Sequence, residues 1–295
     1  MRTSLLVLFV LTAPAAAQVP ATDIFVATLK VTTGPSGAAQ WQVGPPVNVT
    51  HRPGYDNQPC FLPGGRAFLY TVIGDDAQAD IYRYDLTAGK STRLTATPES
   101  EYSPTPLPDG RGFSVVRVEA DSTQRLWAFD LDGSHPRLLL PGVKPVGYHA
   151  WIDSVTVALF VLGTPATLQL GDLRTGKADT VVRDVGRSPQ RVPGRAAVSV
   201  VWRRDSTARW IAIVDAATRT PQPFAPLPDS ADFHAWTPDG TLLASAGTRV
   251  LRWDPQAARW VPIADFAAAG LTSITRLAVS PSGAHLALVA IPAAR

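Results

Sequence analysis

A short turn of the Pro, Asp and Gly type returns six times along this chain at a nearly constant interval. Between the middle residues of successive turns, the steps are 45, 44, 41, 45 and 43 residues. This period, with short alternating segments around each turn, is typical of one four-stranded blade of a β-propeller. We therefore expect an all-β fold, a six-bladed β-propeller with four-stranded blades. The turns are Pro63-Gly64-Gly65, Pro108-Asp109-Gly110, Ile152-Asp153-Ser154, Pro193-Gly194-Arg195, Pro238-Asp239-Gly240 and Pro281-Ser282-Gly283.

The two ends of the chain are expected to share one blade. After the last turn only residues 284–291 remain, which is enough for a single strand. Residues 23–29 repeat the pattern of residues 80–86, and residues 41–49 can follow them as a return strand. N-terminal strands that complete the C-terminal blade would close the ring and remove its open sheet edges.

The first residues have the pattern of a secretory signal. Arg2 gives a charged start, residues 5–11 form a short apolar run, and residues 15–17 are small alanines. We expect a cleavable signal peptide over residues 1–17, a single propeller domain over residues 18–295, and a periplasmic or secreted protein. No stretch reaches the roughly 18 apolar residues of a transmembrane helix, so no transmembrane segment is expected.

Charge and cysteine content narrow the functional classes. The formal net charge is only +3, and the arginines are scattered rather than grouped, so the chain lacks the basic stripe of a nucleic-acid-binding protein. Cys60 is the single cysteine, which excludes an internal disulfide. It falls on a predicted inner strand, where a buried, unreactive thiol is expected.

Two of the turns carry a more specific signal. Residues 237–244 read Thr-Pro-Asp-Gly-Thr-Leu-Leu-Ala, and residues 280–288 read Ser-Pro-Ser-Gly-Ala-His-Leu-Ala-Leu. A small polar residue, a Pro-Asp-Gly core and an apolar strand in this order resemble the TolB-type β-propeller repeat family. The resemblance covers residues 23–291 and implies the propeller fold. It implies no single function, because this repeat occurs in scaffold proteins and in the propeller caps of serine peptidases. Residues 18–22 are too few for the α/β domain that precedes the propeller in the family's namesake.

The loops that lead into the six inner strands are the candidate functional region, because they surround one mouth of the central channel. Ionisable and aromatic residues gather in these mouth loops. We predict a ligand- or partner-binding rim formed by Tyr55, Asp56, Glu99, Glu101, Tyr102, Tyr148, His149, Arg187, Arg191, Asp232 and His234.

The histidines of the rim have two interpretations. His149-Ala150-Trp151 and His234-Ala235-Trp236 occupy the same place in two blades, and a repeated residue is explained more simply by a role in the blade than by ligand binding. No short ligand spacing of the zinc or calcium type links the histidines and carboxylates, so we assign no metal site and no cofactor. The chain also lacks a Gly-x-Ser-x-Gly nucleophile motif, and no catalytic residue is assigned.

Two functions remain open. The first is an exported binding or scaffolding module of the cell envelope whose rim holds a protein, peptide or glycan partner. Tyrosines and arginines dominate binding hot spots, and Tyr55, Tyr102 and Tyr148 with Arg187 and Arg191 could form the floor of such a site. The alternative is a channel-centred hydrolase or lyase that uses rim histidines and carboxylates, with or without a divalent metal.

Overall fold

The computed structural model describes residues 21–292 except residues 35, 36, 38, 205–207 and 230. The predicted signal peptide, residues 1–17, lies outside the described residues. No helix in the described part of the chain is long and apolar enough to cross a membrane.

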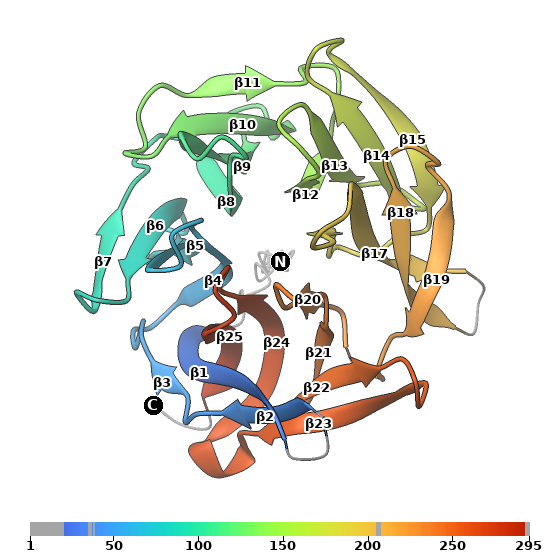
Figure 1. Cartoon of the computed structure of the whole chain (residues 1–295). Helices are drawn as coiled ribbons and strands as arrows, with labels where there is room; N and C mark the ends of the chain where they lie inside the picture. The colour runs from blue at the N-terminus through green and yellow to red at the C-terminus, as the bar shows by residue number, and fades with distance from the viewer. Residues whose placement is uncertain (1–20, 35–36, 38, 205–207, 230, 293–295) are drawn as a thin grey trace, which may run out of the picture.

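Six antiparallel sheets stand around a central axis, as predicted for a six-bladed propeller (Figure 1). Each of the first five blades follows the chain from its inner to its outer strand. Blade 1 contains β4 (Tyr55–Phe61), β5 (Ala67–Ile73), β6 (Ala79–Asp85) and β7 (Lys90–Arg93). Blade 2 contains β8 (Ser100–Pro106), β9 (Gly112–Val118), β10 (Gln124–Asp130) and β11 (Arg137–Leu139). Blade 3 contains β12 (Val146–Trp151), β13 (Thr156–Val161), β14 (Thr167–Asp172) and β15 (Lys177–Arg183).

Blades 4 and 5 have shorter inner strands, of two and three residues. Blade 4 contains β16 (Gln190–Arg191), β17 (Ala197–Arg203), β18 (Arg209–Asp215) and β19 (Pro221–Pro226). Blade 5 contains β20 (His234–Trp236), β21 (Leu242–Ala246), β22 (Arg249–Asp254) and β23 (Arg259–Asp265). A short 3₁₀ turn, η1 (Ala267–Ala269), leads from blade 5 into blade 6.

Blade 6 is built from both ends of the chain, which confirms the predicted ring closure. Its inner strands are β24 (Leu271–Val279) and β25 (His285–Pro292), and its outer strands are β1 (Asp23–Thr33), β2 (Ala39–Val43) and β3 (Val47–Asn48). The backbone of β1 pairs with β25 from Asp23 opposite Ala290 to Thr28 opposite His285. The expected return strand is split, because β2 pairs with the far half of β1 and β3 with its near half.

The apolar core lies between neighbouring blades, and β1 contributes to two of these interfaces. Successive side chains of a strand point to opposite faces of its sheet. Ile24 and Val26 accordingly pack against blade 1, whereas Phe25 and Ala27 pack against blade 5. The N-terminal strand therefore fills the space on both sides of blade 6 and also supplies its third strand.

The six repeated turns connect the inner strand of each blade to the next strand. Five of them contain a glycine with a positive φ, for example 70° at Gly110 and 86° at Gly240, a conformation that glycine adopts without steric cost. The N–H of each of these two glycines donates to the carbonyl three residues earlier. The turn of blade 3 lacks a glycine and is closed differently, since the Asp153 carboxylate accepts the backbone N–H groups of Val155 and Thr156.

Removal of residues 1–50 should abolish cooperative folding. Blade 6 would keep only β24 and β25, and two apolar interfaces would open to water. Thermal unfolding followed by circular dichroism should then show a broad, non-cooperative transition or aggregation.

Two single substitutions on β1 separate the effect of packing from that of deletion. Ile24 is fully buried, so Ile24→Ala should lower the free energy of unfolding by about 2–4 kcal/mol. Val31 lies on the same strand with 40% of its surface exposed, so Val31→Ala should change it by less than about 1 kcal/mol. Equal losses in both variants, or a truncated chain that melts like the full-length protein, would contradict closure by β1.

Candidate functional site

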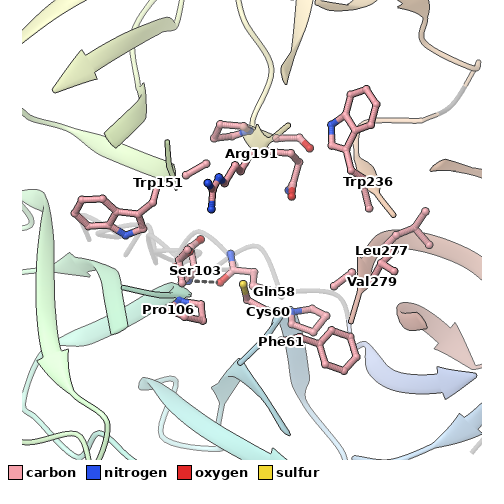
Figure 2. Close-up of a pocket in the computed structure, with 18 of the residues that line it drawn as sticks. Gln58, Cys60, Phe61, Ser103, Pro106, Trp151, Arg191, Trp236, Leu277 and Val279 are labelled. Atoms are coloured by element: carbon pink, nitrogen blue, oxygen red, sulfur yellow. Dashed lines mark hydrogen bonds between the residues drawn. The ribbon is translucent and has the colours of Figure 1, made fainter. Parts of the chain in front are cut away.

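The inner strands surround a central channel with a volume of about 660 Å³ (Figure 2). Its wall runs from the mouth loops, at Arg187 and Phe233, to the repeated turns at the other end, at Pro63 and Pro281. Prolines recur along the wall. Proline carries no backbone N–H, so these inner strands have few free backbone donors with which a ligand could pair as an additional β-strand. The channel therefore depends on side chains for specific polar contacts.

β-Bulges in β4 and β8 fix the polar groups on one side of this wall. Gln58 and Ser103 lie at the two bulges and have positive φ values of 59° and 55°. The Gln58 side-chain oxygen accepts hydrogen bonds from the Ser103 backbone N–H and from the Thr71 hydroxyl, both at 2.7 Å. Figure 2 shows the bond to Ser103 as a dashed line. These bonds hold blades 1 and 2 in fixed relative positions at the channel.

Arg276 of β24 organises the mouth of the channel. Its Nε donates to the Asn57 side-chain oxygen at 3.1 Å, and its guanidinium carbon lies 3.8 Å from the centre of the Phe233 ring. The same group lies 5.3 Å from the centre of the Tyr148 ring. Three blades thus meet at one arginine, which is held by a hydrogen bond and by cation–π contacts.

The predicted tyrosines gather near this arginine. Burial raises the pKa of Tyr55 to about 12, and the charges of Arg276 and Arg187 partly oppose that rise. The hydroxyls of Tyr148 and Tyr102 also influence this group, so the three tyrosines lie within electrostatic range of one another. All three are half-buried, and Tyr148 lines the channel itself. Tyr55 therefore stays protonated at neutral pH and can act as a hydrogen-bond donor.

The predicted rim carboxylates lie outside the channel wall and make ion pairs with other arginines. Asp56 has no exposed surface and binds Arg52 at 2.6 Å. Asp232 is exposed and binds Arg209 at 2.7 Å.

Glu99 and Glu101 share a third arginine. Arg117 forms a short ion pair with Glu99, and its Nε lies 3.2 Å from Glu101. Glu101 accepts a hydrogen bond from the Thr97 hydroxyl at 2.5 Å, and it has no exposed surface. The expectation that Glu101 faces a ligand in the channel is therefore not met, because its carboxylate is enclosed beside Arg117. Burial raises the pKa of Glu101 to about 7 and that of Asp56 to about 6.

Arg187 and Arg191 remain at the channel without such partners. Both side chains are exposed and line the wall, and neither forms an ion pair or hydrogen bond with any residue that the structure describes. In Figure 2 the Arg191 side chain points into the cavity, toward the side of Gln58 and Ser103. These arginines are the predicted rim residues that line the channel, are exposed and have no partner among the described residues.

His149 and His234 belong to two equivalent buried clusters. The Trp151 indole N–H donates to the Ser114 hydroxyl at 2.9 Å, and that hydroxyl shares a hydrogen bond of 2.6 Å with His149 Nε2. Trp236, Ser199 and His234 repeat this arrangement at 2.8 and 2.6 Å. Each cluster joins two neighbouring blades.

Burial limits the chemistry that the histidines and serines of these clusters can perform. It lowers the pKa of His149 and of His234 to about 3, so both imidazoles are neutral. Ser114 and Ser199 have no exposed surface, and a serine nucleophile in either place would be inaccessible to a substrate. The geometry therefore supports the structural interpretation of the repeated histidines.

Metal and thiol chemistry find little support at the channel. Among residues 21–292 that are described, no three His, Cys, Asp or Glu side chains lie close enough together to hold a metal ion. Cys60 is half-buried in the channel wall rather than enclosed, and its surroundings raise the pKa of the thiol to about 12. The thiol is therefore protonated at neutral pH and a poor nucleophile.

The predicted set omitted Gln58, Phe233 and Arg276, which contribute to the channel mouth and wall. Phe233 and Arg276 belong to segments expected to be mouth loops, and this placement was the available signal. Phe233 also lies between the predicted residues Asp232 and His234. Gln58 falls inside a strand, and its contact with blade 2 depends on a bulge that alternation alone does not indicate. A ligand-binding role for Tyr148, Arg187 and Arg191 stays a prediction.

Loss of either buried histidine should destabilise the fold. His149→Ala and His234→Ala each leave a cavity and remove a partner from a buried serine, so each should lower the free energy of unfolding by about 2–4 kcal/mol. Urea unfolding measures this loss. Lys177→Ala, on an exposed position of β15, is the control and should stay within about 0.5 kcal/mol. Histidine variants that are as stable as this control would contradict the structural role of His149 and His234.

Glu101→Gln should alter the pH dependence of stability. The folded-state pKa of Glu101 is raised, so its stabilising contribution is complete below about 4.5, its usual value, and is lost as the pH rises through about 7. Between pH 5 and 8 the wild-type protein should lose up to about 3 kcal/mol relative to Glu101→Gln, measured by urea unfolding across this range.

Glu119→Gln is the control for this titration. Hydrogen bonding from Arg125 lowers the pKa of Glu119, so this variant should differ from the wild type by a constant amount between pH 5 and 8. A constant difference for Glu101→Gln as well would show that Glu101 ionises normally in the folded protein.

Comparisons with known proteins bear on the fold. No family model and no curated protein matches the chain. Among solved structures, a protein from Agrobacterium tumefaciens assigned as TolB is 17% identical with a TM-score of 0.69, and the match covers 92% of this chain and 99% of that one. TolB from Acinetobacter baumannii is 15% identical with a TM-score of 0.58, covering 91% of this chain and 64% of that one.

An enzyme has the same architecture. A protein from Xanthomonas campestris described as a gluconolactonase is 10% identical with a TM-score of 0.62, and the match covers 94% of this chain and 99% of that one. Fold likeness at such low identity does not select between a binding protein and an enzyme. What the comparisons establish is that this chain has the TolB-like six-bladed β-propeller fold that its repeated turns predict.

Proposed function

We propose that the protein is an exported binding module of the cell envelope and that its central channel holds a protein, peptide or glycan partner. The observation that carries this proposal is the set of accessible arginines at the channel. Arg187 and Arg191 line a concave wall, are exposed, and bind no described residue. A charged group kept in a cavity without a partner is available to a ligand.

The surroundings of these arginines support binding by a preorganised site. Arg276 is fixed by Asn57 and Phe233, and Gln58 is fixed by blade 2. A site whose groups are already ordered loses less conformational entropy when a partner binds. The signal-like N-terminal sequence supports export.

The alternative function, a hydrolase or lyase, has less support at this channel. The carboxylates that would act as acid, base or metal ligand are ion-paired outside the wall, at Asp56, Glu101 and Asp232. His149 and His234 are neutral and hydrogen-bonded to buried serines. The fold shared with a gluconolactonase keeps an enzymatic role as the second candidate.

A steric block of the channel tests the proposed function without assuming the partner's chemistry. Gln190 lies on the inner strand β16 and lines the channel, so Gln190→Trp should fill part of it. Wild-type protein immobilised on beads should capture a partner from envelope extract, and Gln190→Trp should lose at least about nine-tenths of that capture, measured by quantitative mass spectrometry.

Lys177→Trp is the matched control, because it adds the same ring to an exposed position on β15, away from the channel. It should capture the partner like the wild type, and the melting temperatures of both variants should show that they are folded. A partner captured equally by the blocked and unblocked proteins would mean that the channel is not the binding site.

A further inference from the structure

We propose that the channel binds a short acidic peptide segment, whose carboxylates are held by Arg187, Arg191 and Arg276. This inference rests on the proposed function and specifies the ligand of the same site. It follows from the charge, shape and wall chemistry of the channel.

The charge of the channel wall is one-sided. Arg187, Arg191 and Arg276 line it, and the described residues of the wall include no aspartate or glutamate. This imbalance does not reflect a shortage of acids nearby, since Asp56, Glu101 and Asp232 pair with arginines outside the wall. Like charges on a concave wall focus an electric field that attracts anions.

The three arginines are suited to carboxylates in complementary ways. Arg276 is already fixed by Asn57 and Phe233, one of its terminal nitrogens donates a hydrogen bond of 3.5 Å to the Tyr148 hydroxyl, and it makes no ion pair with the described residues. Arg191, on β16, extends into the cavity (Figure 2). Arg187 lies farther out, at the mouth. A guanidinium presents two parallel N–H donors to a carboxylate, which makes the pair short, directional and strong.

The shape of the channel favours an extended chain over a compact anion. Its wall runs the length of the inner strands, and seven-residue β4 alone spans about 20 Å at the usual rise of a strand. An extended peptide of about six residues has the same length. Prolines such as Pro59 and Pro106 provide apolar wall between the polar groups, which suits the methylene and backbone surface of a peptide.

The aromatic residues disfavour a sugar ligand. Sugar rings pack on open aromatic faces, but the guanidinium of Arg276 already lies over Phe233 and Tyr148. Trp151 is 5% exposed, and its indole N–H is bound to Ser114. The half-buried Trp236 packs against Phe224, with ring centres 5.3 Å apart, and its indole N–H is bound to Ser199. A peptide carboxylate needs none of these faces, because it binds the arginines themselves.

Binding measurements with four compounds distinguish the possible ligands. Two are fluorescently labelled peptides, hexaglutamate and hexaglutamine, and two are competing anions, trigalacturonate and inorganic pyrophosphate. Hexaglutamate should bind the wild-type protein at low ionic strength, and hexaglutamine should bind at least about tenfold more weakly. Arg191→Gln should weaken hexaglutamate binding about tenfold or more, and added salt should weaken it further. The labelled peptides are followed by fluorescence anisotropy, and the other two anions compete for the same site.

Arg137→Gln is the control for nonspecific attraction, because Arg137 lies on the outer strand β11, paired with Asp130. It should bind hexaglutamate within twofold of the wild type. Equal weakening by Arg191→Gln and Arg137→Gln would overturn the proposal, and so would tighter binding of trigalacturonate or pyrophosphate than of hexaglutamate. Melting temperatures identify any variant that fails to fold, and Arg191→Lys then replaces Arg191→Gln with the same expected direction.

The two proposals fail in distinguishable ways. If Gln190→Trp abolishes partner capture but hexaglutamate does not bind, the channel is a binding site whose ligand is not an acidic peptide. If hexaglutamate binds through Arg191 but Gln190→Trp captures the envelope partner normally, the acidic specificity stands and the proposed role of the channel in partner capture fails.

Discussion

The structure depends on the pairing of β1 with β25, because this ladder converts a row of blades into a closed ring. One strand from the N-terminus completes the last blade, and its alternating side chains fill the interfaces with blades 1 and 5. In a propeller each blade is stabilised mainly by its two neighbours. An open ring would leave two blades with one neighbour each. The channel exists only because the ring is closed, so the geometry of the candidate site depends on the pairing of β1 with β25.

Ion pairing inside single loops and blades separates the charges of the mouth. Arginines and carboxylates occur together in the sequences of the mouth loops. In the folded ring the carboxylates pair with arginines outside the channel wall, such as Arg52 and Arg117, whereas Arg187 and Arg191 remain at the channel. The net charge of the protein is only +3, yet the described channel wall carries three arginines and no aspartate or glutamate. Local pairing, rather than net charge, decides which ligands the channel can attract.

The sequence predicted the parts of the fold that repeat. The six turns gave the number of blades, and the likeness of residues 23–29 to residues 80–86 gave the closure. It did not predict which way individual mouth residues point. Glu101 lies one residue inside β8, where it pairs across the ladder with Arg117, and the sequence offered no sign that this pair would be enclosed. A bulge in β24 interrupts the alternation just before Arg276, so strand periodicity could not place that side chain.

The serine–histidine–tryptophan clusters reveal a larger repeat than the single blade. Ser114, His149 and Trp151 recur 85 residues later as Ser199, His234 and Trp236, so two consecutive blades form the repeating unit and the ring approximates a threefold arrangement of blade pairs. By their distance from the repeated turns, the positions equivalent to Ser199, His234 and Trp236 in the third pair are Ala287, Pro59 and Phe61. That pair is the one joined by the chain ends. In two of the pairs a buried polar cluster fixes the neighbouring blades. At the equivalent place between blades 6 and 1 the three residues are apolar, and a directional contact between these blades is instead the hydrogen bond from Arg276 to Asn57. The channel mouth thus supplies, between the blades at the chain ends, a polar contact of the kind that the buried clusters supply in the other two pairs.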